Sequence, residues 1–458
     1  MANTYLTRTN SGTGSETKGT YSAWIKRSKL GGASDYLWHT SEDTNNDIKI
    51  LTNSSDSIRV RGINNGSAIV NLIPNKLFKD VSGWYHLVVA FDTTQATEAD
   101  RVKMYVNGVQ ITSFSTATYP SQNLNLKLNQ SGDRRTIGTA YDNGGSPSAA
   151  YWNGLMTQVI WVDGTAYGPS TFGSVNATSG IWVGNTSPTV TYGTNGYNLD
   201  MANSSDMGND VSGNANDFTV SGTLTQAKDC PSNVFATMNR ESPTTVALAD
   251  MANGNLYNGD QSPNKWQGIP GTLAAEKGKI YWEVKIENVW GNTSQNSQRH
   301  GIGNIAAAVD NNTSDAYDIQ WTSAAYGIGW CNSSGVRNSG SVTGTGNYST
   351  FVATNILMFA MDLDNLKLYL GKNGVWEYSG DPTSGASGTG AYTIPAAGMW
   401  APYSETRYGS DTISWNIGNG SFRTVAVSSA GTNASANGIF EYDVPTGYTA
   451  LSTKGLNL

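Results

Sequence analysis

Apolar and polar residues alternate with a period of two along much of the chain, which is the pattern of strands with one buried face. The segment 280–287 is typical: its apolar positions are Ile280, Trp282, Val284 and Ile286, and its other positions are Tyr281, Glu283, Lys285 and Glu287. Residues 123–128, with leucine at every second position, predict another such strand. The run 86–91 is apolar at nearly every position and predicts a strand buried on both faces.

Two tight hairpins are predicted where Asn-Gly separates strand-like segments, at Asn107-Gly108 and Asn373-Gly374. This residue pair tolerates the positive φ angles of a primed two-residue turn. One short helix is expected at 273–277, ended by Gly278. Sheets with one apolar face must bury it against another layer, so the pattern predicts an all-β chain of two jelly-roll-like β-sandwich domains.

The density of strand signals and the residue composition divide the chain into three regions. Strand signals are dense in 1–174 and return in 251–458, with no repeat relating the two regions. Between them, 175–250 is rich in Asn, Gly, Ser and Asp and has few strand-like runs. We therefore expect two different sandwiches joined by a loop-rich connector or small subdomain.

Composition supports this fold class and limits the classes of partner that the chain is expected to bind. Of 458 residues 52 are glycine, and only 14% are charged, whereas helical proteins use many Glu, Lys and Arg residues. The net charge is −7 and no basic run occurs, so no nucleic-acid partner is expected. No apolar stretch approaches the roughly 20 residues of a spanning helix, and the N-terminus lacks a secretory pattern. We expect synthesis in a cytoplasm and no membrane insertion.

The first region resembles laminin-G-like, concanavalin-A-type jelly rolls. The matching segments, in order, are 20–28 (TYSAWIKRS), 84–92 (WYHLVVAFD), 102–111 (VKMYVNGVQI), 136–142 (TIGTAYD) and 152–164 (WNGLMTQVIWVDG). The opening YLTRT followed by YSAWIKRS is also similar to jelly rolls of tailed-phage virion proteins, particularly those of marine phages.

The third region resembles a SPRY domain. Its matching segments are 278–286 (GKIYWEVKI), 326–330 (YGIGW), 356–376 (ILMFAMDLDNLKLYLGKNGVW), 400–403 (WAPY) and 413–418 (ISWNIG). Two connector segments, 210–219 and 229–239, are similar to segments that join such modules in phage fibre proteins.

These resemblances imply a structural and binding protein on the virion surface, a tail fibre or similar appendage made in the host cytoplasm. Its implied partners are other virion proteins and a host-surface glycan or protein. The alternative is a capsid or tail decoration that serves assembly and particle stability without host binding. A homo-oligomer is expected, with a trimer, as in many fibres, as one form.

Catalysis is not expected. A glycosidase on this kind of jelly roll needs two carboxylates flanking the scissile bond, but no Glu-x-Asp-x-(x)-Glu run occurs. The nearest pairs are Glu283 with Glu287 and Asp362 with Asp364. Only three histidines exist, and no nucleophile elbow or phosphate loop is present.

No cofactor is expected, and a bound structural calcium ion is kept as an alternative. Calcium takes oxygen ligands, and the alternating run Asp210, Ser212, Asn214, Asn216 offers them. Such runs are more often hydrogen-bonded turns. The resemblance to laminin-G-like domains adds Asp142 and Asp163 as candidate calcium ligands at the rim of the sandwich.

Aromatic residues in polar loops are the candidates for ligand contact, because sugars stack their C–H faces on Trp and Tyr and pair their hydroxyls with polar groups. The same residue types also fill cores and subunit interfaces. The candidates in the first region are Trp38, His39, Tyr141, Asp142, Asn143, Tyr151 and Trp152, and the 290–292 loop adds Trp290 and Asn292. Loops at one end of SPRY domains commonly bind partners, which adds Tyr317, Trp321, Tyr348 and Tyr408.

Overall fold

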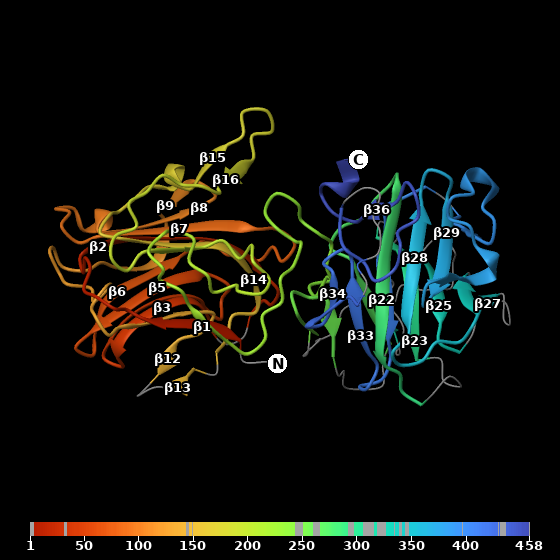
Figure 1. The fold of residues 1–458 in the computed structure, drawn as a ribbon, viewed down its shortest axis with the longest axis horizontal. Helices are drawn as coiled ribbons and strands as arrows, with labels where there is room; N and C mark the ends of the chain where they lie inside the picture. The colour runs from red at the N-terminus through yellow and green to blue at the C-terminus, as the bar shows by residue number, and fades with distance from the viewer. Residues whose placement is uncertain are drawn as a thin grey trace. The chain divides into compact units, whose positions relative to one another are not determined.

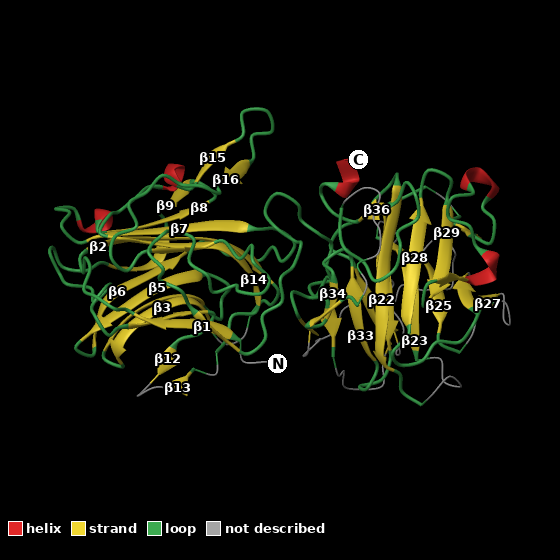
Figure 2. Ribbon diagram, viewed as in Figure 1, coloured by secondary structure: helices red, strands yellow, loops and turns green. Residues whose placement is uncertain are grey.

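The protein was analysed as a computed structural model. The structure describes residues 4–31, 34–142, 146–148, 150–242, 251–259, 266–291, 297–305, 316–317, 327–333, 335–338, 341–343, 348–395, 397–428, 430 and 437–457. In this part of the chain the helical segments are short 3-10 turns between strands (Figure 1, Figure 2): η1 (Glu98–Asp100), η2 (Pro169–Thr171), η3 (Glu377–Ser379), η4 (Gly385–Ser387) and η5 (Gly455–Asn457). The chain divides into two compact units, Met1–Gln226 and Ala227–Leu458.

The first unit is a sandwich of two antiparallel sheets. One sheet has the order β10-β6-β5-β4-β3-β11-β1-β18: β1 (Tyr5–Thr9), β3 (Asp35–Asp43), β4 (Asn46–Thr52), β5 (Ile58–Asn64), β6 (Ser67–Pro74), β10 (Phe114–Thr118), β11 (Arg134–Ile137) and β18 (Thr219–Ser221). The other has the order β17-β14-β2-β7-β8-β9: β2 (Lys18–Arg27), β7 (Tyr85–Asp92), β8 (Val102–Val106), β9 (Val109–Ile111), β14 (Gly154–Asp163) and β17 (Tyr197–Leu199). Two short hairpins lie outside these sheets: β12 (Tyr141–Asp142) with β13 (Ser146–Pro147), and β15 (Gly173–Val175) with β16 (Trp182–Gly184).

Both sheets contribute to one core in this unit. Trp38 of β3 stacks on Trp161 of β14 with ring centres 4.8 Å apart, and both rings are fully buried. On β7, Leu87 and Val89 belong to this core, whereas Val88 packs in a second cluster on the outer face with Phe172. The prediction that 86–91 is buried on both faces is confirmed.

The second unit is also a two-sheet sandwich. Its larger sheet has the order β19-β20-β33-β22-β28-β29-β30, with β31 beside β29 and β36 beside β22: β19 (Met251–Ala252), β20 (Tyr257–Asn258), β22 (Lys279–Asn288), β28 (Ile356–Asp362), β29 (Lys367–Lys372), β30 (Val375–Trp376), β31 (Tyr392–Thr393), β33 (Thr412–Asn416) and β36 (Thr449–Ala450). The facing sheet has the order β24-β21-β32-β23-β25-β26-β27: β21 (Trp266–Pro270), β23 (Gln298–Asn304), β24 (Ala316–Tyr317), β25 (Gly327–Cys331), β26 (Val336–Asn338), β27 (Ser341–Thr343) and β32 (Trp400–Thr406). A short hairpin pairs β34 (Ser421–Phe422) with β35 (Val425–Ala426).

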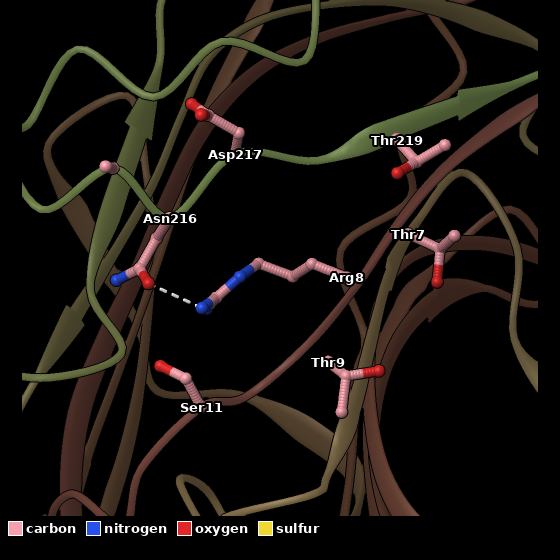
Figure 3. A pocket seen from close by; sticks show the side chains of 8 residues that line it. Thr7, Arg8, Thr9, Ser11, Asn216, Asp217 and Thr219 are labelled. Carbon is pink, nitrogen blue, oxygen red and sulfur yellow. Dashed lines mark hydrogen bonds between the residues drawn. The ribbon is translucent and has the colours of Figure 1, made fainter.

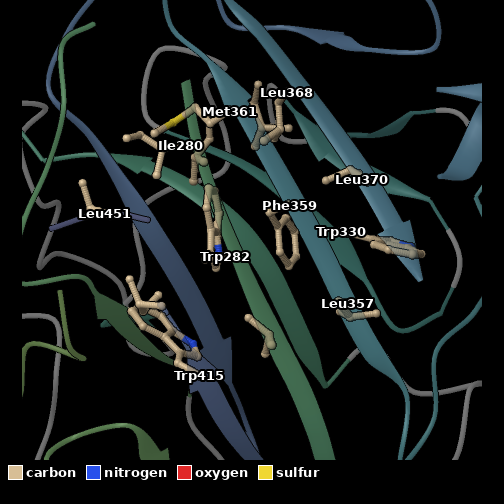
Figure 4. Close-up of a cluster of buried hydrophobic side chains, with 14 of the residues drawn as sticks. Ile280, Trp282, Trp330, Leu357, Phe359, Met361, Leu368, Leu370, Trp415 and Leu451 are labelled. Atoms are coloured by element: carbon tan, nitrogen blue, oxygen red, sulfur yellow. The ribbon is translucent and has the colours of Figure 1, made fainter. Parts of the chain in front are cut away.

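Large aromatic side chains fill the space between the two sheets of the second unit (Figure 4). Trp282 of β22 stacks on Phe359 of β28, with ring centres 5.1 Å apart and planes inclined by 9°. Trp330 of the facing sheet is fully buried in the same cluster. The predicted all-β chain with two β-sandwich domains is thus confirmed.

Both predicted Asn-Gly hairpins are present. Asn107 and Gly108 have φ angles of 48° and 80° between β8 and β9, and Asn373 and Gly374 have 52° and 85° between β29 and β30. Positive φ at both central positions is the requirement of the primed turn that Asn-Gly satisfies at low cost.

Three local expectations are wrong. Residues 123–128 are not a strand, because Asn123 and Lys127 have positive φ angles, although Leu126 and Leu128 are buried. Residues 273–277 are not a helix; instead Ala275 forms an isolated bridge with Trp400. The second face of 280–287 is not solvated throughout, because a separate apolar cluster that includes Phe440 and Ala450 covers Tyr281.

The described residues of the expected connector, 175–250, do not form a separate domain but belong to the two units. β17 pairs with β14, and β18 pairs with β1, so that the chain up to Gln226 completes the first sandwich. Beyond it, Phe235 bridges to Ser452 and Met238 to Gly271 within the second unit. Short strand segments flanked by Asn and Gly carry too little apolar pattern to be recognised from sequence. Residues 243–250 lie outside the described residues.

Candidate ligand-binding surfaces

Trp38 and His39 are core residues, which corrects the expectation that they lie in an exposed loop. Trp38 donates a hydrogen bond from Nε1 to the Tyr197 hydroxyl at 2.8 Å. His39 points to the other face of β3 and is also fully buried, with Nε2 4.0 Å from the Asp47 carboxylate. Burial lowers the pKa of His39 well below its usual value, so the ring is neutral.

Three tyrosines that are distant in sequence meet at one end of the first unit. The hydroxyls of Tyr5 and Tyr141 are 3.1 Å apart, and the Tyr151 ring centre is 6.2 Å from that of Tyr5. The guanidinium of Arg134 lies 4.1 Å from the centre of the Tyr141 ring. Burial, followed by the hydrogen bond with Tyr5, raises the pKa of Tyr141 to about 12. The cluster therefore offers half-buried aromatic faces, hydroxyl groups and one cation.

The neighbouring Trp152 is partly buried against the core of the first unit. Its indole N–H is buried, and no hydrogen-bond partner for it is present among the described residues. At Asp142, the backbone pairs with Ser146 in the β12–β13 hairpin, and the structure does not describe its side chain. Asn143 lies outside the described residues.

In the second unit the structure brings Trp290 and Tyr408 together. Their rings are stacked, with centres 4.0 Å apart and planes inclined by 28°, and 41% of Trp290 is exposed. Asp411 holds both backbones: one carboxylate oxygen accepts the Trp290 N–H at 2.8 Å, and the other accepts the Tyr408 N–H at 3.0 Å. Burial raises the pKa of Asp411, and these hydrogen bonds oppose the shift.

Behind this ring pair, cations and aromatic rings alternate. The Arg407 guanidinium lies 5.2 Å from the Tyr408 ring centre and 5.7 Å from that of Trp266. On Trp266 lies Arg299, 3.6 Å from the ring centre, and Arg299 forms a buried ion pair with Glu405 at 3.0 Å. Contacts of this kind are favourable when they are desolvated. The exposed pair therefore rests on a series of packed, mutually oriented side chains.

The other sequence candidates of the second unit do not join this surface. Tyr348 is buried, with its ring 6.1 Å from Tyr378 and 5.4 Å from Tyr392, so its predicted exposure is wrong. The side chain of Tyr317 is not described, and Trp321 and Asn292 lie outside the described residues.

Sequence reasoning missed a polar groove of about 340 Å³ in the first unit, between β1 and the segment before β18 (Figure 3). Its lining residues are Thr7, Arg8, Thr9, Ser11, Ala215, Asn216, Asp217 and Thr219. Arg8 donates to Asn216 Oδ1 at 2.5 Å and to Asn10 Oδ1 at 3.3 Å. Arg8 and Asn216 are 208 positions apart, and no local motif marks either residue. The guanidinium ties this segment to β1, and the hydroxyls around it can hydrogen-bond a small polar molecule.

The carboxylates considered for chemistry are occupied by hydrogen bonds and ion pairs. Asp362 is fully buried and pairs with Lys279 at 3.1 Å, and Asp364 accepts the Gly278 N–H at 2.9 Å. Glu283 accepts four hydrogen bonds, and Glu287 accepts one from the Ser414 hydroxyl at 2.7 Å. These hydrogen bonds and the ion pair hold turns and strands in place.

The acidic candidates for calcium are likewise engaged. Asp210 accepts the backbone N–H groups of Asn198, Ser212 and Asn216. Asp163 accepts those of Ser15 and Asn195. Within the described residues there is no group of three or more His, Cys, Asp or Glu side chains placed to hold a metal ion. No helix in that part of the chain is long and apolar enough to cross a membrane.

A family model matches most of the first unit. Residues 1–166 match the family model of the concanavalin A-like lectin/glucanases superfamily. No curated protein matches the chain.

Several solved structures are similar to part of the chain at low identity. The SPRY domain of human HERC1 is 13% identical, with a TM-score of 0.26, and the match covers 35% of this chain and 85% of that one. A heptameric SAP-like pentraxin from Limulus polyphemus is 15% identical (TM-score 0.29; 40% and 85% covered). Domain 4 of AbnA, a GH43 extracellular arabinanase from Geobacillus stearothermophilus solved with arabinotriose, is 18% identical (TM-score 0.25; 34% and 65% covered).

Proposed function

We propose that this chain is a non-enzymatic structural and binding protein, displayed on a tailed-phage virion as a tail fibre or similar appendage, that recognises a host-surface glycan. The observation that carries the binding role is the exposed Trp290 ring, stacked on Tyr408 and held in place by Asp411. The match of residues 1–166 to a lectin and glucanase superfamily supports it. Display on a virion is proposed because the first region and the connector resemble phage proteins. The SPRY-like character of the second unit is proposed from its sequence segments.

The physical argument starts from the shape of a sugar ring, which has an apolar C–H face and a rim of hydroxyl groups. An exposed indole provides a flat apolar surface for that face. Asp411 fixes the backbone on both sides of the ring pair, so little side-chain or loop entropy has to be lost on binding. The Arg407 guanidinium lies 5.2 Å from the centre of the Tyr408 ring and is the cation next to this ring pair.

The tyrosine cluster of the first unit is a second surface for the same ligand class. Tyr5, Tyr141 and Tyr151 are half-buried and combine ring faces with hydroxyl groups, and Arg134 lies over one of the rings. This cluster has no fully exposed ring, so we place the main contact at Trp290.

Display on a particle makes weak sites effective. Copies of a chain on one virion engage a cell surface together, and the effective concentration of the second and later sites multiplies the affinity of the first. Other virion proteins, which are also made in the host cytoplasm, are the partners that would hold the chain in the particle.

The experiment measures binding of the purified full chain to immobilised host cell-wall polysaccharides and to whole host cells, with Trp290→Ala as the test variant. Tyr378→Ala is the matched control, because Tyr378 is another exposed aromatic residue of the second unit. We expect saturable binding by the native chain, at least about tenfold weaker binding by Trp290→Ala, which is about 1.4 kcal/mol, and no change for Tyr378→Ala. Equal binding by Trp290→Ala would contradict this site, and absence of saturable binding would contradict the function.

Two further measurements separate this proposal from its alternatives. Antibody labelling of intact particles should place the chain on the tail; labelling of the capsid or tail lattice, together with no host binding, would favour a decoration protein. Incubation with host polysaccharides should release no new reducing ends, and release of reducing ends would show an enzyme.

A further inference from the structure

Basic side chains lie together on the outer face of the eight-stranded sheet of the first unit, the sheet that contains β3, β5 and β6 (Figure 1). On β5, Ile58 and Val60 belong to the core. Side chains alternate across a strand, so Arg59 and Arg61 point outward, and both are half-buried. On β4, Lys49 lies directly opposite Arg61 and points the same way. Three cations therefore share one small area of the sheet.

The charge of the two arginines is not neutralised by this protein. Like charges directly opposite one another on two strands lower the stability of a sheet. Lys49 is compensated, because its Nζ lies 3.0 Å from the Asp47 carboxylate. No carboxylate among the described residues pairs with Arg59 or Arg61. Acidic residues are not scarce in the chain, which has 35 of them against 28 basic ones.

Neighbouring side chains orient these cations. Asn71 of β6 accepts a hydrogen bond from Arg59 Nε at 2.8 Å, and the Nη atoms of Arg59 have no hydrogen-bond partner in the described part of the chain. Burial, followed by the charge of Arg61, lowers the pKa of Arg59, and the Tyr36 hydroxyl opposes this shift. The Tyr36 ring lies beside the cations, with its centre 5.6 Å from Lys49 Nζ. Two guanidinium groups, an amide and an aromatic ring thus meet at one place.

These groups match an oxyanion that is carried by a sugar. A guanidinium can donate two parallel N–H bonds to a carboxylate or sulfate group. The half-buried Tyr36 ring offers an apolar surface to the C–H face of the sugar. A nucleic-acid duplex fits less well, because it carries one charge per about 1.7 Å of its axis and its binding rests on many basic contacts. The sequence contains no basic run that could supply them.

We propose that Arg59, Arg61 and Tyr36 form a binding site for the carboxylate or sulfate groups of an acidic polysaccharide. This inference rests on the proposed glycan-binding function, and it adds the chemical class of the glycan and a contact in the other unit from Trp290. Opposite charges on the two partners favour their encounter, so the site also acts before close contact is made.

Binding of the full chain to three immobilised probes tests the proposal: polygalacturonate, which carries carboxylates, dextran sulfate, and uncharged dextran. The test variant is Arg59→Gln/Arg61→Gln. The matched control is Lys76→Gln/Lys79→Gln, which removes the same charge from exposed positions of the first unit. We expect saturable binding to at least one anionic probe and none to dextran. Binding should be at least about tenfold weaker for the arginine variant and change less than about twofold for the control.

Thermal unfolding at low salt separates this site from a structural role. Removal of one of two opposed cations relieves repulsion, so Arg61→Gln should melt at the same temperature as the native chain or higher. A clear decrease in melting temperature would show that Arg61 serves the fold and would overturn the proposal. Equal probe binding by the native chain and the arginine variant would also overturn it, as would the absence of saturable binding to both anionic probes.

Two further comparisons fix what a failure means. Binding of a double-stranded DNA probe as tightly as the anionic polysaccharides would overturn the assignment to a glycan. The proposed function is tested with host polysaccharides and Trp290→Ala, and this site with defined probes and the arginine variant. Loss of host binding with retained probe binding would contradict the proposed function alone, whereas retained host binding with no effect of the arginine variant on probe binding would contradict this inference alone.

Discussion

The carboxylate of Glu283 in β22 accepts the backbone N–H of Tyr442 at 2.9 Å, across 159 positions of sequence. The same fully buried group accepts the Glu441 N–H at 2.9 Å and the Tyr281 hydroxyl at 3.0 Å. Asn416 supplies a fourth hydrogen bond at 3.1 Å. A single side chain thus holds the segment that follows Phe440 against the middle of the larger sheet, and these four hydrogen bonds explain why a Glu is fully buried at this position of β22.

Replacement of Glu283 by Gln should lower the free energy of unfolding by about 2–4 kcal/mol, because the amide nitrogen would face two donors that the carboxylate oxygen accepts. Burial raises the pKa of Glu283 from 4.5 to about 7, against the opposing hydrogen bonds. Since the folded form holds the proton more tightly than the unfolded chain, this group stabilises most below pH 4.5, and that contribution is lost as the pH rises to about 7.

Urea denaturation of the native chain and of Glu283→Gln, at several pH values between 4 and 8, measures both effects. The native protein should be more stable than Glu283→Gln at low pH, and this advantage should become smaller as the pH rises through this window. Only the native protein carries the Glu283 carboxyl group, so only it loses that contribution. Glu287→Gln is the control on the same strand face, where the carboxylate is partly exposed and accepts one hydroxyl. A pH dependence that is unchanged in Glu283→Gln would contradict the assignment.

Arg135→Met should destabilise the first unit by about 2–4 kcal/mol. The guanidinium is fully buried, 4.8 Å from the Trp161 ring centre, and it donates to Asn129 Oδ1 and Asn10 Oδ1. Its loss removes hydrogen bonds from a charged donor and leaves their acceptors buried. Thermal unfolding measures the effect, and Arg134→Met, at the neighbouring half-exposed position, should cost less than about 1 kcal/mol. Equal effects of the two substitutions would show that the buried contacts of Arg135 add no stability.

Local signals in the sequence were sufficient for the hairpins and for the doubly buried strand. Asn107-Gly108 needs only its own φ angles, and 86–91 needs only its own apolar run. Residues 123–128 show the limit of this reasoning: the same alternation arises when a loop buries Leu126 and Leu128 while it turns at Lys127. Period alone does not distinguish a strand from a loop that is pinned to the core.

The candidate surfaces depend on contacts that local patterns do not contain. Trp38 and His39 precede a polar run, but β3 is the fifth strand of an eight-stranded sheet in the described chain, and both of its faces are covered there. Trp290 was recognisable as a Trp in a polar loop, whereas its stacking on Tyr408 depends on how Asp411 holds the two segments. Tyr5 gave no signal, because its partner Tyr141 lies 136 positions away.

Gly108→Ala should destabilise the first unit by more than Gly132→Ala. Both glycines have positive φ angles, of 80° and 89°, so both substitutions carry backbone strain of about 1 kcal/mol. At Gly108 a Cβ atom would also lie 2.4 Å from the Trp182 ring, whereas at Gly132 it would meet no atom within 4 Å. The ring must move, which disturbs its hydrogen bond to His86. Thermal unfolding of both variants gives the comparison, and equal losses would show that the Trp182 contact is not rigid.

Removal of divalent cations should leave the stability of the chain unchanged. The two acidic positions with described side chains that the sequence offered for calcium, Asp210 and Asp163, use their carboxylate oxygens to accept backbone N–H groups. A calcium ion prefers several oxygen ligands directed at one point, and these oxygens are directed at donors instead. A ligand that binds only the folded state raises the melting temperature in proportion to its binding free energy. We therefore expect the same melting temperature in EDTA and in millimolar calcium; an increase of several degrees with calcium, absent with magnesium, would show a site and contradict this prediction.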